Sequence, residues 1–156
     1  MAAVEVNVGS AVVKLRRPWV VGAFSLIPFY WVFWYYAVNR EMRDFGRARS
    51  NAALGESKPA RSVVGVTAGA IVVVPWIVSL WQAVWRIEAC ERLTGARRQS
   101  SALVLALLLG ASLIPWIGVF AGNGVLAIVL TYSGLPAVVA ATVLMQRRLT
   151  RLWTEG

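Results

Sequence analysis

The residues of this chain that could take part in chemistry are charged side chains at the ends of its first two apolar segments. General acid–base chemistry near neutral pH most often uses histidine, and the sequence contains none. The HExxH and P-loop patterns are also absent. We therefore predict no catalytic residue and a non-enzymatic protein. The charged candidates occur in two short stretches and are Arg40, Glu41, Asp44, Arg86, Glu88 and Glu91.

Cys90 is the only cysteine of the chain. One cysteine without any histidine cannot form an intrachain disulfide or assemble a zinc site. The carboxylates of Glu88 and Glu91 stand on either side of Cys90 in the sequence and disfavour its thiolate, the reactive form. We predict a small buried side chain at this position, no metal and no cofactor.

Three stretches of the sequence carry no charged residue and are long enough to cross a bilayer. They run from Pro18 to Asn39, from Ser62 to Trp85 and from Gln99 to Gln146, over 22, 24 and 48 residues. A helix needs about 20 apolar residues to cross the hydrocarbon core, where a charge costs about 2.5–3.5 kcal/mol. We predict an all-α polytopic membrane bundle, one domain over 1–156, with apolar segments at about 18–39, 62–85, 101–121 and 125–146.

The excess of basic residues fits a membrane surface. The formal net charge is +9, and each basic side chain near anionic lipid is worth about 1 kcal/mol. We therefore predict a bilayer with anionic headgroups as a partner, and no nucleic acid. The charged residues at the segment ends have two interpretations. They form solvated ion pairs, which we favour because such pairs are common, or a headgroup or partner site at the membrane edge.

Two arrangements of the apolar segments are open. Four crossing helices, with kinks at Pro28, Pro75 and Pro115, place both termini in the cytoplasm, but the loop 40–61 with its 6 basic residues then faces outward, against the positive-inside rule. Reversal of the chain near Pro28 and Pro75 instead gives two re-entrant hairpins plus one transmembrane hairpin that turns at Gly122–Gly124, with every basic residue inside. Irregular backbone at membrane depth must be satisfied within the protein, so we favour four helices.

Two GxxxG patterns predict close packing between helices. They join Gly65 to Gly69 and Gly118 to Gly122. Glycine lets two helix backbones approach each other, and we expect this contact within one chain rather than between two.

Aromatic residues gather just before the two charged stretches. A ligand cage is one interpretation, but we favour an aromatic belt at the level of the lipid headgroups. The residues concerned are Trp34, Tyr35, Tyr36, Trp81 and Trp85.

The aromatic-rich apolar segment that ends in a Tyr and Trp cluster occurs in residues 26–41 and again in 74–88, and Gln146 precedes a basic tail. This plan resembles the bacterial membrane family called domain of unknown function 4234, chiefly over residues 14–95. Leu26-Ile27-Pro28-Phe29 replaces the Leu-Gly-Ile-Tyr-like turn of that family. The resemblance implies a bacterial multi-span membrane protein and supplies no catalytic residues.

The predicted function is that of a non-enzymatic component of the bacterial inner membrane, which packs with itself or with other membrane proteins. A lipid-headgroup-binding or lipid-modifying protein is one alternative. A small transporter or channel subunit is another, and it needs a polar path through the bilayer. The polar residues available for such a path are Ser25, Thr67, Ser79, Gln82, Ser112, Asn123, Thr131, Tyr132 and Ser133.

Overall fold

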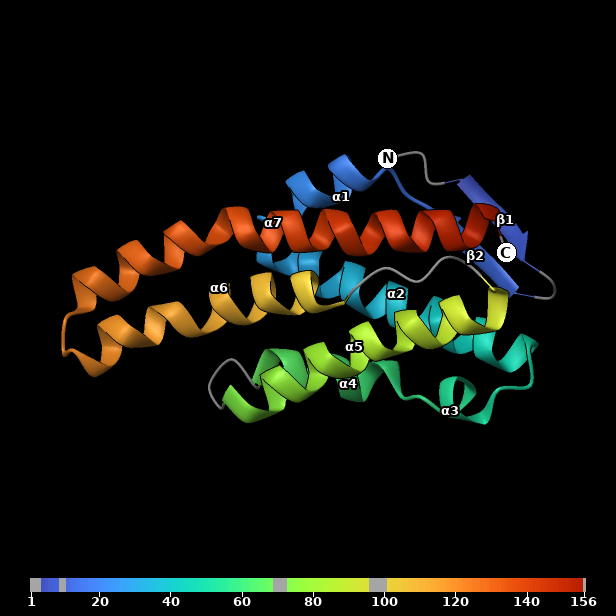
Figure 1. Cartoon of the computed structure of the whole chain (residues 1–156), viewed down its shortest axis with the longest axis horizontal. Helices are drawn as coiled ribbons and strands as arrows, with labels where there is room; N and C mark the ends of the chain where they lie inside the picture. Colours follow the sequence, from blue (N-terminus) through green and yellow to red (C-terminus); the bar gives the residue numbers. More distant parts are fainter. Residues whose placement is uncertain (1–3, 9–10, 69–72, 96–100, 156) are drawn as a thin grey trace.

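The computed structural model describes residues 4–8, 11–68, 73–95 and 101–155, and within these residues the chain is mostly helical, as predicted (Figure 1). A short β-hairpin precedes the helices. The elements are β1 (Val4–Val8), β2 (Ala11–Leu15), α1 (Pro18–Phe24), α2 (Pro28–Ala48), α3 (Ala52–Gly55), α4 (Pro59–Ala68), α5 (Val73–Thr94), α6 (Ala102–Phe120) and α7 (Gly124–Glu155).

The N-terminal β-hairpin is a feature that the all-α prediction missed. β1 and β2 pair antiparallel, from Val4 opposite Leu15 to Val8 opposite Ala11. Val13 is completely buried, and β2 packs against α2. The signal was in the sequence: Val-Glu-Val-Asn-Val alternates apolar and polar residues, and two residues separate it from the second β-branched run.

The helices form three consecutive hairpins. α1 turns back into α2, α4 packs along α5, and α6 packs along most of the apolar part of α7. In Figure 1, α1 and α6 run toward one end of the molecule and α2 and α7 return, so the charged ends of α2, α5 and α7 gather at the opposite end. The α6–α7 hairpin extends beyond the other two (Figure 1).

Backbone hydrogen bonds pair the N–H groups of the first reversal. The N–H groups of Ser25 and Ile27 donate to the carbonyls of Val21 and Phe24, each over 2.9 Å, and Leu26 donates to Ala23 over 3.5 Å. Pro28, which has no N–H group, then opens α2. The N–H groups at this turn are therefore satisfied within the protein, which meets that part of the objection to irregular backbone at membrane depth.

The structure does not confirm the favoured four-span bundle. Among the described residues, two helices, α6 and α7, are long and apolar enough to cross a membrane. Only 17% and 6% of their most apolar stretches is buried inside the protein, so both helices expose apolar side chains along most of these stretches. The segment 18–39 is divided between α1 and α2, and residues 69–72 of the segment 62–85 lie outside the described residues. α1 has 7 residues and the described α4 has 10, which reach about 10 and 15 Å.

The prolines occupy different positions in their helices. Pro28 is the first residue of α2 and Pro75 is the third residue of α5, so both follow a chain reversal rather than kink a single span. Pro115 lies inside α6, and Pro136 lies inside α7.

The α6–α7 turn forms where Gly122-Asn123-Gly124 predicted it. Gly122 has φ +66°, which favours glycine, and its N–H donates to the Val119 carbonyl over 3.0 Å. Asn123 then caps α7, because its side-chain oxygen accepts from the Leu126 N–H over 2.9 Å.

Two of the GxxxG glycines, Gly65 and Gly118, pack closely against another helix of the same chain. A side chain at Gly118 would collide with the backbone of Ala127 on α7, and one at Gly65 would collide with Ser79 on α5. Gly122 serves the turn instead, and Gly69 lies outside the described residues.

The aromatic residues divide between core and surface. Trp34 and Tyr35 are buried: the indole N–H of Trp34 donates to Gln146 of α7, and the Tyr35 hydroxyl donates to the Ser79 carbonyl of α5, each over 2.8 Å. The aromatic-belt prediction is therefore wrong for these two. It stays a prediction for the exposed side chains of Tyr36, Trp81 and Trp85.

Candidate functional site

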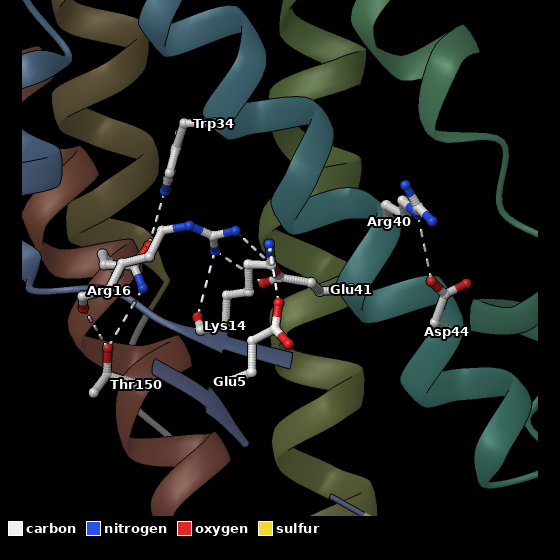
Figure 2. A network of polar contacts seen from close by, with 9 residues as sticks. Glu5, Lys14, Arg16, Trp34, Arg40, Glu41, Asp44 and Thr150 are labelled. Atoms are coloured by element: carbon white, nitrogen blue, oxygen red, sulfur yellow. Dashed lines mark hydrogen bonds and ion pairs between the residues drawn. The ribbon is translucent and has the colours of Figure 1, made fainter. Parts of the chain in front are cut away.

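Two arginines, the half-buried Arg16 and the buried Arg148, are neutralised by carboxylates. Arg16, just after β2, binds both oxygens of Glu41 on α2, with 3.0 Å between Nη1 and Oε2 (Figure 2). Burial raises the pKa of Glu41, and Arg16 opposes that rise. Arg148 of α7 binds Glu91 of α5, through Nε to Oε1 at 2.8 Å and Nη2 to Oε2 at 2.7 Å.

The Arg148 pair belongs to a network that joins three helices. Arg148 and Glu91 have side chains only 2% and 4% exposed. Arg148 also donates to the Ser101 hydroxyl over 3.0 Å, and Ser101 in turn donates to Glu88. α5, α7 and the start of α6 are therefore held together at the charged end of the molecule.

Arg40 and Asp44 show a different arrangement, at the surface. Arg40 is exposed and lies 3.7 Å from Asp44, one helical turn along α2 (Figure 2). Asp44 also accepts from its neighbour Arg43 over 2.8 Å. These are solvated ion pairs of the kind that we favoured, whereas Glu41, Arg86 and Glu91 are buried.

Arg86 is a buried cation without a counter-charge. It is 8% exposed, and its Nη1 donates to the neutral side chains of Asn39 on α2 and Ser62 on α4, the latter over 2.9 Å. In the described part of the chain no carboxylate lies within 4.0 Å of Arg86, and no partner is found for its Nε and Nη2 donors. Burial lowers the pKa of the Arg86 guanidinium, and the coulombic effect of Tyr35 opposes this.

A pocket of about 610 Å³ opens beside Arg86, between α4 and α5. Two further cations, Lys58 and Arg61, line it, and its one acidic lining residue is Glu56. The neutral hydrogen-bonding side chains of its wall come from both helices and are Ser62, Ser79 and Gln82. A second hollow of about 360 Å³ shares Glu56, Gln82 and Arg86 with the first.

This chemistry fits an anion. Guanidinium groups bind phosphate and carboxylate through paired N–H donors, and a low-dielectric wall strengthens the attraction. A phosphate placed beside Arg86 would take up the donors that the protein leaves unused and would neutralise the buried charge.

Sequence reasoning identified Arg86 but missed the residues that make it a site. In the sequence, Asn39 and Ser62 stand at the ends of charge-free stretches, and Lys58 and Arg61 belong to the loop 40–61. The available signal was the position of polar residues at both ends of the 62–85 segment. Arg86 is 47 residues from Asn39 and 24 from Ser62 in the sequence, so only the tertiary fold shows that they meet.

The polar residues inside the apolar helices bond to their own backbones. The hydroxyls of Thr131 and Thr142 donate to carbonyls four residues earlier, each over 2.8 Å, and Ser112 does so over 2.6 Å. Each of these hydroxyl donors is used within its own helix, and the transporter alternative stays a prediction.

Cys90 is expected to stay unlabelled by maleimide at about pH 8 in the folded protein and to react fully after unfolding. Its side chain is fully buried, and burial, reinforced by the nearby Glu91, raises the pKa of the thiol to about 12. The sequence-based expectation of a disfavoured thiolate rested on Glu88 and Glu91; the structure adds burial as the larger cause and retains Glu91. Intact-mass spectrometry with and without denaturant measures the reaction, and rapid labelling of the folded protein would contradict it.

In comparisons with known proteins, no family model, no curated protein and no solved structure matches this chain. The resemblance to the family called domain of unknown function 4234 and the packing with membrane-protein partners therefore stay predictions.

Proposed function

We propose that this protein is a non-enzymatic membrane protein that binds the phosphate of an anionic lipid headgroup in the pocket beside Arg86. The observation that carries the proposal is a buried guanidinium with unused donors and no counter-charge, in a pocket whose wall also holds Lys58 and Arg61. A buried charge is strongly unfavourable unless it is paired, so an anionic ligand is the natural partner.

The proposed placement in the bilayer is the re-entrant one. The α6–α7 hairpin crosses the membrane, while the α1–α2 and α4–α5 hairpins enter from the charged side and return to it. Three features support this: the short α1 and α4, the paired N–H groups at the first reversal, and the gathering of charged residues at one end of the helices. By the positive-inside rule the charged side faces the cytoplasm.

The height of the pocket in this placement matches a headgroup. Arg86 directly follows the charge-free stretch that ends at Trp85, so it lies where hydrocarbon gives way to the polar interface. The exposed rings of Trp81 and Trp85 on the same helix are of the kind found at that level.

Phosphatidylglycerol is expected to raise the melting temperature of the protein in neutral detergent, and phosphatidylcholine, which has no net charge, is not. A lipid at about 100 times its Kd stabilises by about 2.7 kcal/mol. The variant Arg86→Gln should fold, because it leaves no carboxylate unpaired, and should lose this stabilisation. Arg40→Gln removes one exposed charge outside the pocket and serves as the matched control.

Three results would overturn the proposal. They are an undiminished phosphatidylglycerol effect in Arg86→Gln, an equal effect of phosphatidylcholine on the unsubstituted protein, and the same stabilisation by inorganic phosphate alone. The last would assign the pocket to a soluble anion.

A further inference from the structure

We propose that this protein senses and favours membrane curvature, because it occupies far more area in the leaflet on its charged side than in the opposite leaflet. The inference rests on the membrane placement proposed above and is independent of the anion pocket. It follows from the unequal lengths of the three helical hairpins.

The first hairpin reaches only the middle of the membrane-crossing one. Leu26, at its turn, lines an apolar groove together with Tyr132, Leu135 and Pro136 of α7. Pro136 is the thirteenth residue of a helix whose charge-free part runs from Gly124 to Gln146. The turn of α1 and α2 therefore lies near the midplane of a bilayer that α6 and α7 cross.

The second hairpin is short in the same way. The described part of α4 has 10 residues and so reaches about 15 Å, which is half of a hydrocarbon core of about 30 Å. Gly65 of α4 lies against Ser79 of α5, which places the two helices side by side along this depth.

The leaflets consequently hold different numbers of helices. Among the described residues, α1, α2, α4, α5, α6 and α7 lie in the charged-side leaflet, and α6 and α7 continue into the other. With helix diameters of about 10–12 Å, the four additional helices occupy on the order of 300–450 Å². A protein of this shape fits a membrane whose charged-side leaflet is the convex one.

The surface of the first hairpin is suited to lipid. Leu26, Ile27, Phe29 and Phe33 are large apolar side chains at or near its turn, and all are exposed, Phe29 by 79%. Such a patch is unusual on a water-facing surface, whereas lipid tails cover it without penalty.

The test measures sorting between giant vesicles and the narrow membrane tubes pulled from them, with phosphatidylcholine and phosphatidylglycerol as the lipids. Reconstitution inserts the protein in both orientations, and an impermeant dye selects one of them. Dye on Ala60→Cys marks only molecules whose charged side faces outward, and dye on Ala121→Cys marks only the reverse orientation. Both alanines are exposed, and the native Cys90 is buried.

We expect a tube-to-vesicle ratio above one for Ala60→Cys and below one for Ala121→Cys, and both ratios should depart further from one as the tube narrows. Adding Phe29→Lys, which opposes insertion of the first hairpin, should move both ratios toward one. Phe120→Lys, an equally exposed residue at the far end of α6, should not.

Ratios of one for both labels would overturn the curvature proposal. If each dye still reaches only its own orientation, the membrane placement survives and the wedge shape alone fails. In the double variant Ala60→Cys with Ala121→Cys, two dyes on the same molecule would instead refute the placement itself.

Discussion

Replacing Arg148 with methionine is expected to lower the free energy of unfolding by about 3–5 kcal/mol. Both oxygens of Glu91 accept hydrogen bonds from Arg148, and neither side chain is exposed by more than 4%. The substitution leaves the Glu91 carboxylate buried and unpaired, and it also removes the contact with Ser101 at the start of α6. Loss of attraction at a surface pair has a far smaller effect.

Denaturant titration of the protein in detergent micelles, followed by tryptophan fluorescence, measures the change. Arg40→Met is the control, because Arg40 is 61% exposed and only 3.7 Å from Asp44, and we expect at most about 1 kcal/mol from it. Combining Arg148→Met with Glu91→Leu should recover most of the loss, since replacing both partners removes the unpaired charge. Equal destabilisation by Arg40→Met and Arg148→Met would show that the buried ion pair stabilises the fold no more than the exposed pair does.

Arg86 and Arg148 illustrate what the sequence could and could not reveal about the candidate site. Each lies within two residues of the end of a charge-free stretch. The neighbouring sequence does not indicate which of the two meets a carboxylate. Arg148 meets a carboxylate 57 residues away, whereas Arg86 meets only neutral groups. That difference depends on which helices become neighbours, so the interpretation as solvated pairs suited Arg40 but not the buried charges.

The fold was predictable where charge and turn chemistry agreed. The segments expected at about 101–121 and 125–146 correspond to α6 (Ala102–Phe120) and the apolar part of α7, because the Gly-Asn-Gly run marks the turn between them. Within 18–39 the chain reverses at Ser25-Leu26-Ile27, which carries no such signal. Hydropathy cannot distinguish one membrane crossing from a helical hairpin with the same number of uncharged residues. Pro28 and Pro75 were the remaining evidence in the sequence for a reversal.

The first two apolar segments share residues at an offset of 47 positions, among them Pro28 with Pro75 and Trp34 with Trp81, and this offset has a structural counterpart. Pro28 and Pro75 lie at corresponding places near the starts of α2 and α5, which have 21 and 22 residues, and each of these helices follows a short one. Asn39 and Arg86, at the same offset, bond to each other between the two long helices. The similarity in sequence therefore reflects two hairpins built alike and packed together.

A cysteine introduced at Ala121 is expected to react completely with an impermeant thiol reagent on intact bacterial cells, and one at Ala60 only after permeabilisation. Ala121 lies at the α6–α7 turn, which every arrangement considered places outside. Ala60, near the start of α4, is where the arrangements differ: four crossings place it outside, whereas two re-entrant hairpins place it in the cytoplasm. The expected contrast is between full labelling and background.

We expect the native cysteine to add no labelling of its own, because Cys90 is buried and burial raises the pKa of its thiol to about 12. The unsubstituted protein sets the background, and permeabilised cells show that Ala60→Cys is exposed enough to react. Labelling of both positions on intact cells would establish four crossings. It would also place Lys58 and Arg61 on the outer surface, and both the cytoplasmic headgroup site and the unequal leaflets would then be excluded.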